Sequence, residues 1–119
     1  MINGEYLYLN SRDELLRLDI SKIVFFEGDG NYTNIISANK LKGTVCMNLA
    51  RIQDVLNEKL KEHAIIFARV GKRYIVNLNY IYSINLMKQK LILSDGYMFA
   101  YQLDIAKDAL KKLKDLHTK

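Results

Sequence analysis

Short apolar runs separated by corner residues make up most of this chain, and this pattern limits the fold that it can adopt. The run KIVFFE (residues 22–27) ends at the corner GDGN (28–31), after which YTNIISA begins. Runs of this length, rich in β-branched and aromatic residues and bounded by Gly, Asn and Asp, are typical of strands. We therefore expect a mainly β fold of short antiparallel strands.

Further runs support the same interpretation. Segments 5–9 and 14–18 flank a polar corner and predict a hairpin, and LKGTVCM (41–47) continues the meander after YTNIISA. The later runs are AIIFARV, RYIVNLNYI, YSINLM, KLILS and YMFAY, with a tight turn expected at SDG (94–96) between the last two.

Two segments have helical spacing instead. In the middle of the chain, apolar residues recur on one helical face and predict an amphipathic helix over residues 49–61, with Asn48 as its N-cap. A second helix is expected near the C-terminus, where acidic residues come early and lysines late, the order that the helix dipole favours. Its apolar face consists of Leu103, Ala106, Leu110 and Leu113.

Length and composition indicate one domain over residues 1–119. No apolar stretch reaches the roughly 20 residues that a bilayer span needs, and the first residues lack the pattern of a secretion signal. The single cysteine, Cys46, agrees with a reducing compartment, and its apolar surroundings predict a small buried side chain. We expect a cytoplasmic protein that does not enter a membrane.

The positive charge is concentrated in the second half of the chain. Residues 1–62 contain eight basic and nine acidic side chains, whereas residues 63–119 contain ten basic and four acidic ones. Residues 63–94 include five basic residues and no acid. Such a segment predicts either a surface that attracts a polyanion, of which nucleic acid is the commonest in the cytoplasm, or a solvated cationic face.

The sequence gives little evidence for a catalytic site or a metal site. His63 and His117 are the two histidines, and the one cysteine is near neither in the sequence, so we expect no metal site and no cofactor. The GDGN corner lacks the Lys-Ser/Thr pair of a phosphate loop and is followed by a strand pattern, which predicts a turn. The sequence therefore predicts that the protein is not an enzyme.

Three motifs in a fixed order carry a family resemblance. They are E…GNYT (27–33), F.RV…YIVNLNYI (67–81) and L.LSDG (91–96), and over roughly residues 6–113 the chain resembles the LytTR DNA-binding domain of bacterial transcription regulators. The resemblance implies an elongated fold of small antiparallel sheets with one amphipathic helix in the middle and one C-terminal helix. It also implies sequence-specific binding to double-stranded DNA by strand-end loops inserted into successive major grooves, which regulates transcription.

The resemblance assigns DNA base contacts to Asn31 and Thr33 after the first motif, to Lys72 and Arg73 before YIVN, and to Gln102 at the end of the last strand. Each also has a structural interpretation. Asn31 could be a turn residue in the left-handed conformation, Thr33 an ordinary strand residue, and Gln102 a polar residue at the start of the last helix. Because relatives often carry other residues at the corner and at Gln102, the family's target sequences cannot be transferred to this chain.

Arg69, Lys88 and Lys90 are the expected contacts to DNA phosphates. Lys88 and Lys90 flank a predicted hairpin, where they could instead protect a strand edge from aggregation. Arg69 could pair with an acid such as Glu27. For these three residues the sequence leaves both roles open.

The expected partner is double-stranded DNA, bound as direct repeats by two molecules, with a homodimer on DNA as one arrangement. LytTR domains usually follow a phosphorylatable receiver, for which the sequence before Tyr6 has no room, so the chain is either a stand-alone regulator or a domain cut from a longer protein, and control could come from a separate sensor or receiver protein. The alternative function is a small β protein-interaction module with a cationic face. A third hypothesis, binding of single-stranded nucleic acid by stacking, rests on the eight tyrosines.

Overall fold

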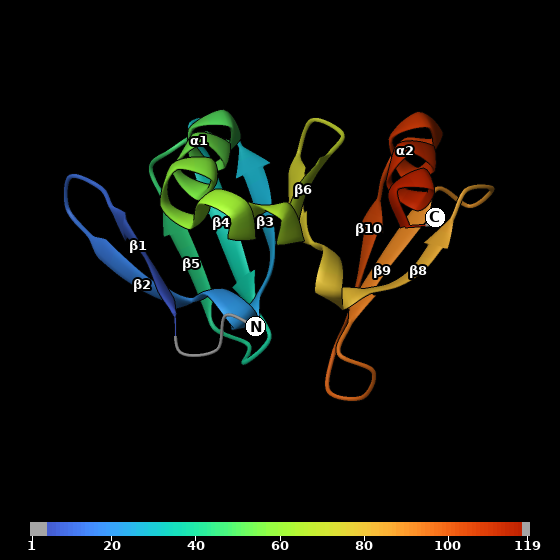
Figure 1. The fold of residues 1–119 in the computed structure, drawn as a ribbon, viewed down its shortest axis with the longest axis horizontal. Helices are drawn as coiled ribbons and strands as arrows, with labels where there is room; N and C mark the ends of the chain where they lie inside the picture. Colours follow the sequence, from blue (N-terminus) through green and yellow to red (C-terminus); the bar gives the residue numbers. More distant parts are fainter. Residues whose placement is uncertain (1–4, 118–119) are drawn as a thin grey trace.

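Three antiparallel sheets and two α-helices make up the computed structural model of this protein, which describes residues 5–117. Figure 1 shows the sheets side by side along the 42 Å long axis, with the two-stranded hairpin at one end and the three-stranded sheet at the other. The mainly β, elongated architecture predicted from the sequence is thereby confirmed, with one helix in the middle of the chain and one at its C-terminus.

The hairpin consists of β1 (Tyr6–Asn10) and β2 (Leu15–Asp19), as predicted. Alternation fixes which face is buried, because Leu7 and Leu9 point into the core while Tyr6 and Tyr8 stay exposed. A 3₁₀ turn, η1 (Ile20–Lys22), then leads into the central sheet.

The central sheet has the order β5-β4-β3-β7-β6. Its strands are β3 (Ile23–Asp29), β4 (Tyr32–Ser37), β5 (Lys42–Val45), β6 (Phe67–Val70) and β7 (Tyr74–Asn77). A register irregularity near the start of β3 places the consecutive residues Val24 and Phe25 in one hydrophobic cluster and leaves Ile23 and Phe26 in the other. The sheet therefore separates two cores.

Helix α1 (Leu49–Leu60) packs its apolar face on the first of these cores. The Asn48 side chain accepts a hydrogen bond of 2.9 Å from the backbone N–H of Arg51, which confirms the predicted N-cap. The helix ends one residue earlier than predicted, because Lys61 adopts a positive φ of 52°. A 3₁₀ segment, η2 (Lys61–Ile66), replaces the start of the strand expected at AIIFARV.

A third 3₁₀ segment divides the strand expected at RYIVNLNYI. Asn77, which is 1% exposed, accepts a hydrogen bond from the backbone N–H of Asn79 and so starts η3 (Leu78–Tyr80). Its amide also donates to the Ile23 carbonyl at 2.9 Å. One side chain therefore ends β7 and ties it to β3.

The three-stranded sheet contains β8 (Ile81–Asn85), β9 (Lys90–Ser94) and β10 (Ala100–Asp104). The tight turn expected at SDG is a longer loop, since Ser94 pairs with Ala100. Within it the Asp95 carboxylate accepts backbone hydrogen bonds from Tyr97, Met98 and Phe99. Partial desolvation raises the pKa of Asp95, but these bonds lower it by more, so the net shift is downward.

Helix α2 (Lys107–His117) covers the second core with Leu110 and Leu113. Leu103, assigned to this helix from its spacing, belongs to β10 instead, because the chain stays extended through Asp104. None of the helices in residues 5–117 combines the length and the apolar composition needed to cross a bilayer. Cys46 is exposed rather than buried, because its neighbour Val45 is the residue that faces the core and successive side chains point to opposite faces.

Candidate nucleic-acid interface

Two glycine turns lie at the same end of the central sheet. The β3–β4 turn follows the last residue of β3, the β6–β7 turn precedes the first residue of β7, and these strands pair antiparallel with Glu27 opposite Tyr74. A hydrogen bond of 2.7 Å from the Gly28 N–H to the Arg73 carbonyl links the two. The sheet therefore brings together residues that are about forty positions apart in the sequence (Figure 1).

The β3–β4 turn consists of Gly30 and Asn31 between the paired residues Asp29 and Tyr32. Gly30 has the positive φ, 61°, and Asn31 does not, so the left-handed conformation considered for Asn31 is wrong. A positive φ at the first turn residue alone is the pattern of a type II′ hairpin, which suits strand twist. Asn31 is exposed at the second position, where its side chain is available to a partner.

Hydrogen bonds from the Arg69 side chain fix the β6–β7 turn, residues 71–73, in place. Its guanidinium donates to the Lys72 carbonyl at 2.9 Å and to Oε1 of Gln53 on α1 at 3.2 Å. Gly71 supplies the positive φ, 65°. Lys72 is exposed at the tip. The alternative pairing of Arg69 with Glu27 does not occur.

The Glu27 carboxylate pairs with Arg73 instead. Its Nη2 atom lies 3.2 Å from Oε2 of Glu27, and its guanidinium lies 5.7 Å from the centre of the Tyr74 ring. Burial and the nearby Glu27 carboxylate raise the pKa of the Tyr74 hydroxyl, so Tyr74 remains a neutral framework residue. The Arg73 side chain is 65% exposed, and its charge is partly offset by Glu27.

Thr33 is fully buried, and its hydroxyl donates to the Met47 carbonyl at 2.7 Å. A buried, hydrogen-bonded hydroxyl in the interior of a sheet cannot meet a base edge without opening β4. Thr33 is therefore an ordinary strand residue and is not part of the candidate interface.

The remaining predicted residues belong to the three-stranded sheet. Lys88 is exposed in the β8–β9 turn, which lies on the same upper side of Figure 1 as the two glycine turns. Lys90 forms an ion pair with its cross-strand partner Asp104. Gln102 is the third of the five residues of β10 and pairs with Ile92, so the expected position at the strand end, next to the helix, is wrong. Gln102 is exposed on β10 and lies outside both glycine turns.

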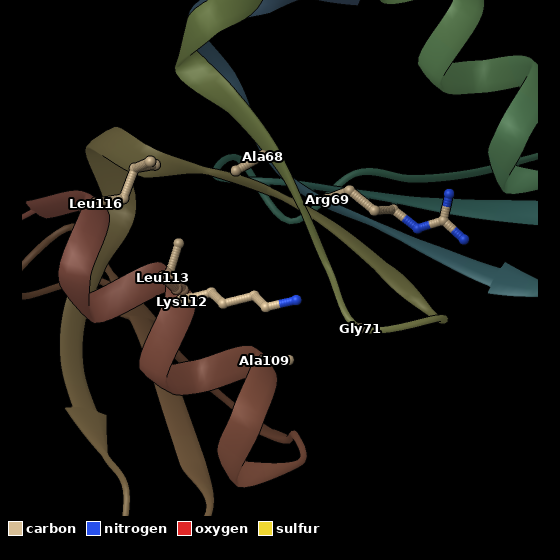
Figure 2. Close-up of a pocket in the computed structure, with 7 residues that line it drawn as sticks. All are labelled: Ala68, Arg69, Gly71, Ala109, Lys112, Leu113 and Leu116. Atoms are coloured by element: carbon tan, nitrogen blue, oxygen red, sulfur yellow. The ribbon is translucent and has the colours of Figure 1, made fainter.

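Sequence reasoning missed one cation beside the β6–β7 turn. Lys112 of α2 lines a groove between the helix and β6 (Figure 2). From the sequence, Lys112 is one of several lysines near the end of a helix, where their charges interact favourably with the helix dipole. Its proximity to Gly71 depends on how α2 packs against β6, which the sequence does not show. The groove is lined by Ala68, Arg69, Gly71, Ala109, Lys112, Leu113 and Leu116.

Across residues 5–117 there is no group of three metal-ligating side chains. The geometry offers exposed amide, amine and guanidinium donors on stiff turns, which suits hydrogen bonding to an anionic or acceptor-rich surface.

Comparison with known proteins agrees with a surface that binds an anionic partner. The family model described as LytTr DNA-binding domain matches residues 13–118. Among solved structures, a LytTr DNA-binding domain from Bacillus cereus is similar with a TM-score of 0.67 and 19% identity, over 98% of this chain and 100% of that chain. At this identity the structural match shows the fold alone. Comparison with curated proteins gave no match.

Proposed function

Because the chain belongs to the LytTR DNA-binding domain family, its general function is DNA binding in transcription regulation, and we propose that it binds specific duplex sequences by inserting its glycine turns into the major groove. The observation that carries this proposal is the pairing of the β3–β4 and β6–β7 turns at one sheet end, with Asn31 and Lys72 exposed at their tips. Such a protein acts in the cytoplasm, where bacterial DNA lies.

The proposed base contacts come from Asn31, Lys72 and Arg73. An amide can bond adenine N6 and N7, and a cation can donate to guanine O6 and N7, each good pairing discriminating by about 1–3 kcal/mol. Stiffness matters because a donor that is already ordered loses less entropy on binding. Here the Arg69 bonds to Lys72 and Gln53 supply that stiffness.

The proposed phosphate contacts come from Arg69 and Lys88. Arg69 uses two of its five N–H donors within the protein, and the others remain for a phosphate. Lys88 is exposed and would extend the contact along the duplex. Lys90 contributes less, because Asp104 already offsets its charge. Two molecules side by side on direct repeats would lengthen the site, and a separate sensor or receiver protein could control occupancy.

The test is selection of bound duplexes from a random pool, followed by titration of the enriched duplex. Lys72→Ala with Arg73→Ala should reduce the preference for the selected over a random duplex by about 5- to 150-fold for each base pairing lost. Lys42→Ala with Lys59→Ala is the matched control, since both lysines are exposed and neither lies in a glycine turn. Enrichment of no motif, or equal behaviour of the two double variants, would refute the proposal.

A protein-interaction module remains the second candidate, favoured by one observation. Tyr82, Tyr97 and Met98 are exposed and line one hollow, together with residues of β9 and β10 in the three-stranded sheet. Exposed apolar clusters of this kind mark protein contacts in many proteins. Selection of duplexes separates the two functions, because a pure interaction module enriches no sequence.

A further inference from the structure

The groove between β6 and α2 lies directly beside the β6–β7 turn. Strand β6 is one of the two edge strands of the central sheet, and α2 packs next to it. Both lining alanines, Ala68 and Ala109, are small, and a Cβ added to Gly71 would meet nothing within 4 Å. The backbone of the turn is therefore approachable from the helix side.

The groove is cationic. Its lining contains Arg69 and Lys112 and no acidic residue. Figure 2 shows the Lys112 amine reaching across toward Gly71, whereas the Arg69 side chain runs away from the helix. Lys112 has no carboxylate within 4.0 Å in the part of the chain that the structure describes.

The packing of α2 sets this orientation. Leu110 and Leu113 are buried in the second core, which turns Ala109, Lys112 and Leu116 toward the groove, since residues three and four apart share a helix face. Asp108 lies one turn before Lys112 and could compete for it, but an exposed pair at this spacing is worth only about 0.3–0.5 kcal/mol. The amine therefore stays available to a stronger anion.

We propose that Lys112 binds a DNA backbone phosphate in this groove, an inference that rests on the proposed function. The major groove is about 12 Å wide and is bounded by a phosphate backbone on each side. A turn inserted into it must therefore have a backbone passing beside it. On the α2 side of the turn, the cationic groove is where that backbone fits, and its charge matches a phosphate. Helix α2 thus flanks the inserted turn without reading bases.

Salt-dependent titration of the selected duplex tests the role of Lys112. One phosphate contact contributes about 0.9 to the slope of log affinity against log salt. Lys112→Gln should flatten the slope by about that amount, which corresponds to roughly 15-fold weaker binding at 50 mM salt if the contact vanishes at 1 M. Lys112→Arg should keep the slope of the wild type, because it keeps the charge.

Lys111→Gln is the matched control. It changes the same net charge at the neighbouring position of the same exposed helix surface, but Lys111 does not line the groove. Its slope should remain within about 0.3 of the wild type. Circular dichroism and thermal unfolding of each variant confirm that the fold is kept.

The two proposals fail in different ways. If wild type binds selected and random duplexes equally, the proposed function fails. If wild type prefers the selected duplex but Lys112→Gln keeps its slope, or loses no more than Lys111→Gln, the phosphate contact at Lys112 is refuted and the proposed function stands.

Discussion

Replacing Glu27 by Gln should weaken the fold slightly and strengthen DNA binding. In the free protein the Glu27 carboxylate lies 3.2 Å from the Arg73 guanidinium, with side-chain exposures of 29% and 65%. A pair this exposed is screened by water and contributes at most about 1 kcal/mol to stability. The free energy of unfolding should therefore fall by no more than that amount.

The effect on binding has the opposite sign. Removing the carboxylate takes away one negative charge beside Arg73, an electrostatic gain toward any duplex that is equivalent to about one added phosphate contact. The salt slope should steepen by up to about 0.9, and affinity at 50 mM salt should rise by up to about 15-fold. Preference for the selected over a random duplex should not rise, since the gain does not depend on sequence.

Fluorescence anisotropy across a salt series measures the binding, and urea unfolding measures the stability. Glu58→Gln is the matched control, because it removes one exposed acid from α1, away from both turns. Weaker binding of Glu27→Gln at low salt would refute the reasoning, since it would mean that the carboxylate holds Arg73 in its binding geometry. A slope equal to that of Glu58→Gln would refute it as well.

Three further predictions concern stability. Asn77→Leu leaves the buried Ile23 carbonyl without this partner, which should cost about 1–3 kcal/mol, whereas the Asn79 N–H belongs to an exposed residue and can bond to water instead; a loss under about 1 kcal/mol by urea unfolding would contradict it. Asn48→Ala removes the α1 cap and should cost about 1 kcal/mol, with the DNA salt slope unchanged; a changed slope would show that α1 contacts DNA. The lowered pKa of Asp95 means that its carboxylate stabilises the fold above the ordinary pKa of 3.8 and that this contribution is lost as pH falls through the lower folded-state value. Asp95→Asn should therefore reduce the pH dependence of unfolding below that ordinary value, whereas identical acid profiles would count against it.

The parts of the fold that depend on neighbouring residues were predictable. Helix α1 and its Asn48 cap follow from spacing and a local hydrogen bond, and the β1–β2 hairpin follows from alternation around a polar corner. The strand ends were harder to predict. Cys46 was misplaced because the run GTVCM does not show which of its apolar residues faces the core, and Leu103 was misplaced because helical spacing does not show where the chain leaves β10.

The arrangement of the candidate site could not be predicted from the sequence, because it depends on contacts between distant parts of the chain. The partner of Glu27 is Arg73 rather than Arg69, because the register of β3 and β7 sets Glu27 opposite Tyr74. Thr33 is buried in β4, where it pairs with Gly28 of β3 and Val45 of β5, and Lys112 lies beside the turn only through the packing of α2. Residue types pointed to the β6–β7 turn, but only the tertiary arrangement shows which of its side chains are exposed and which are paired within the protein.

The central sheet belongs to two cores at once, since Phe26 and Ile75 face α1 while their neighbours Phe25 and Val76 face α2. Neither helix can detach without stripping one side from the same three inner strands. Heating should therefore melt residues on both sides in a single cooperative transition, with equal calorimetric and van't Hoff enthalpies. A mutation beneath one helix would then loosen the turns as surely as one beneath the other.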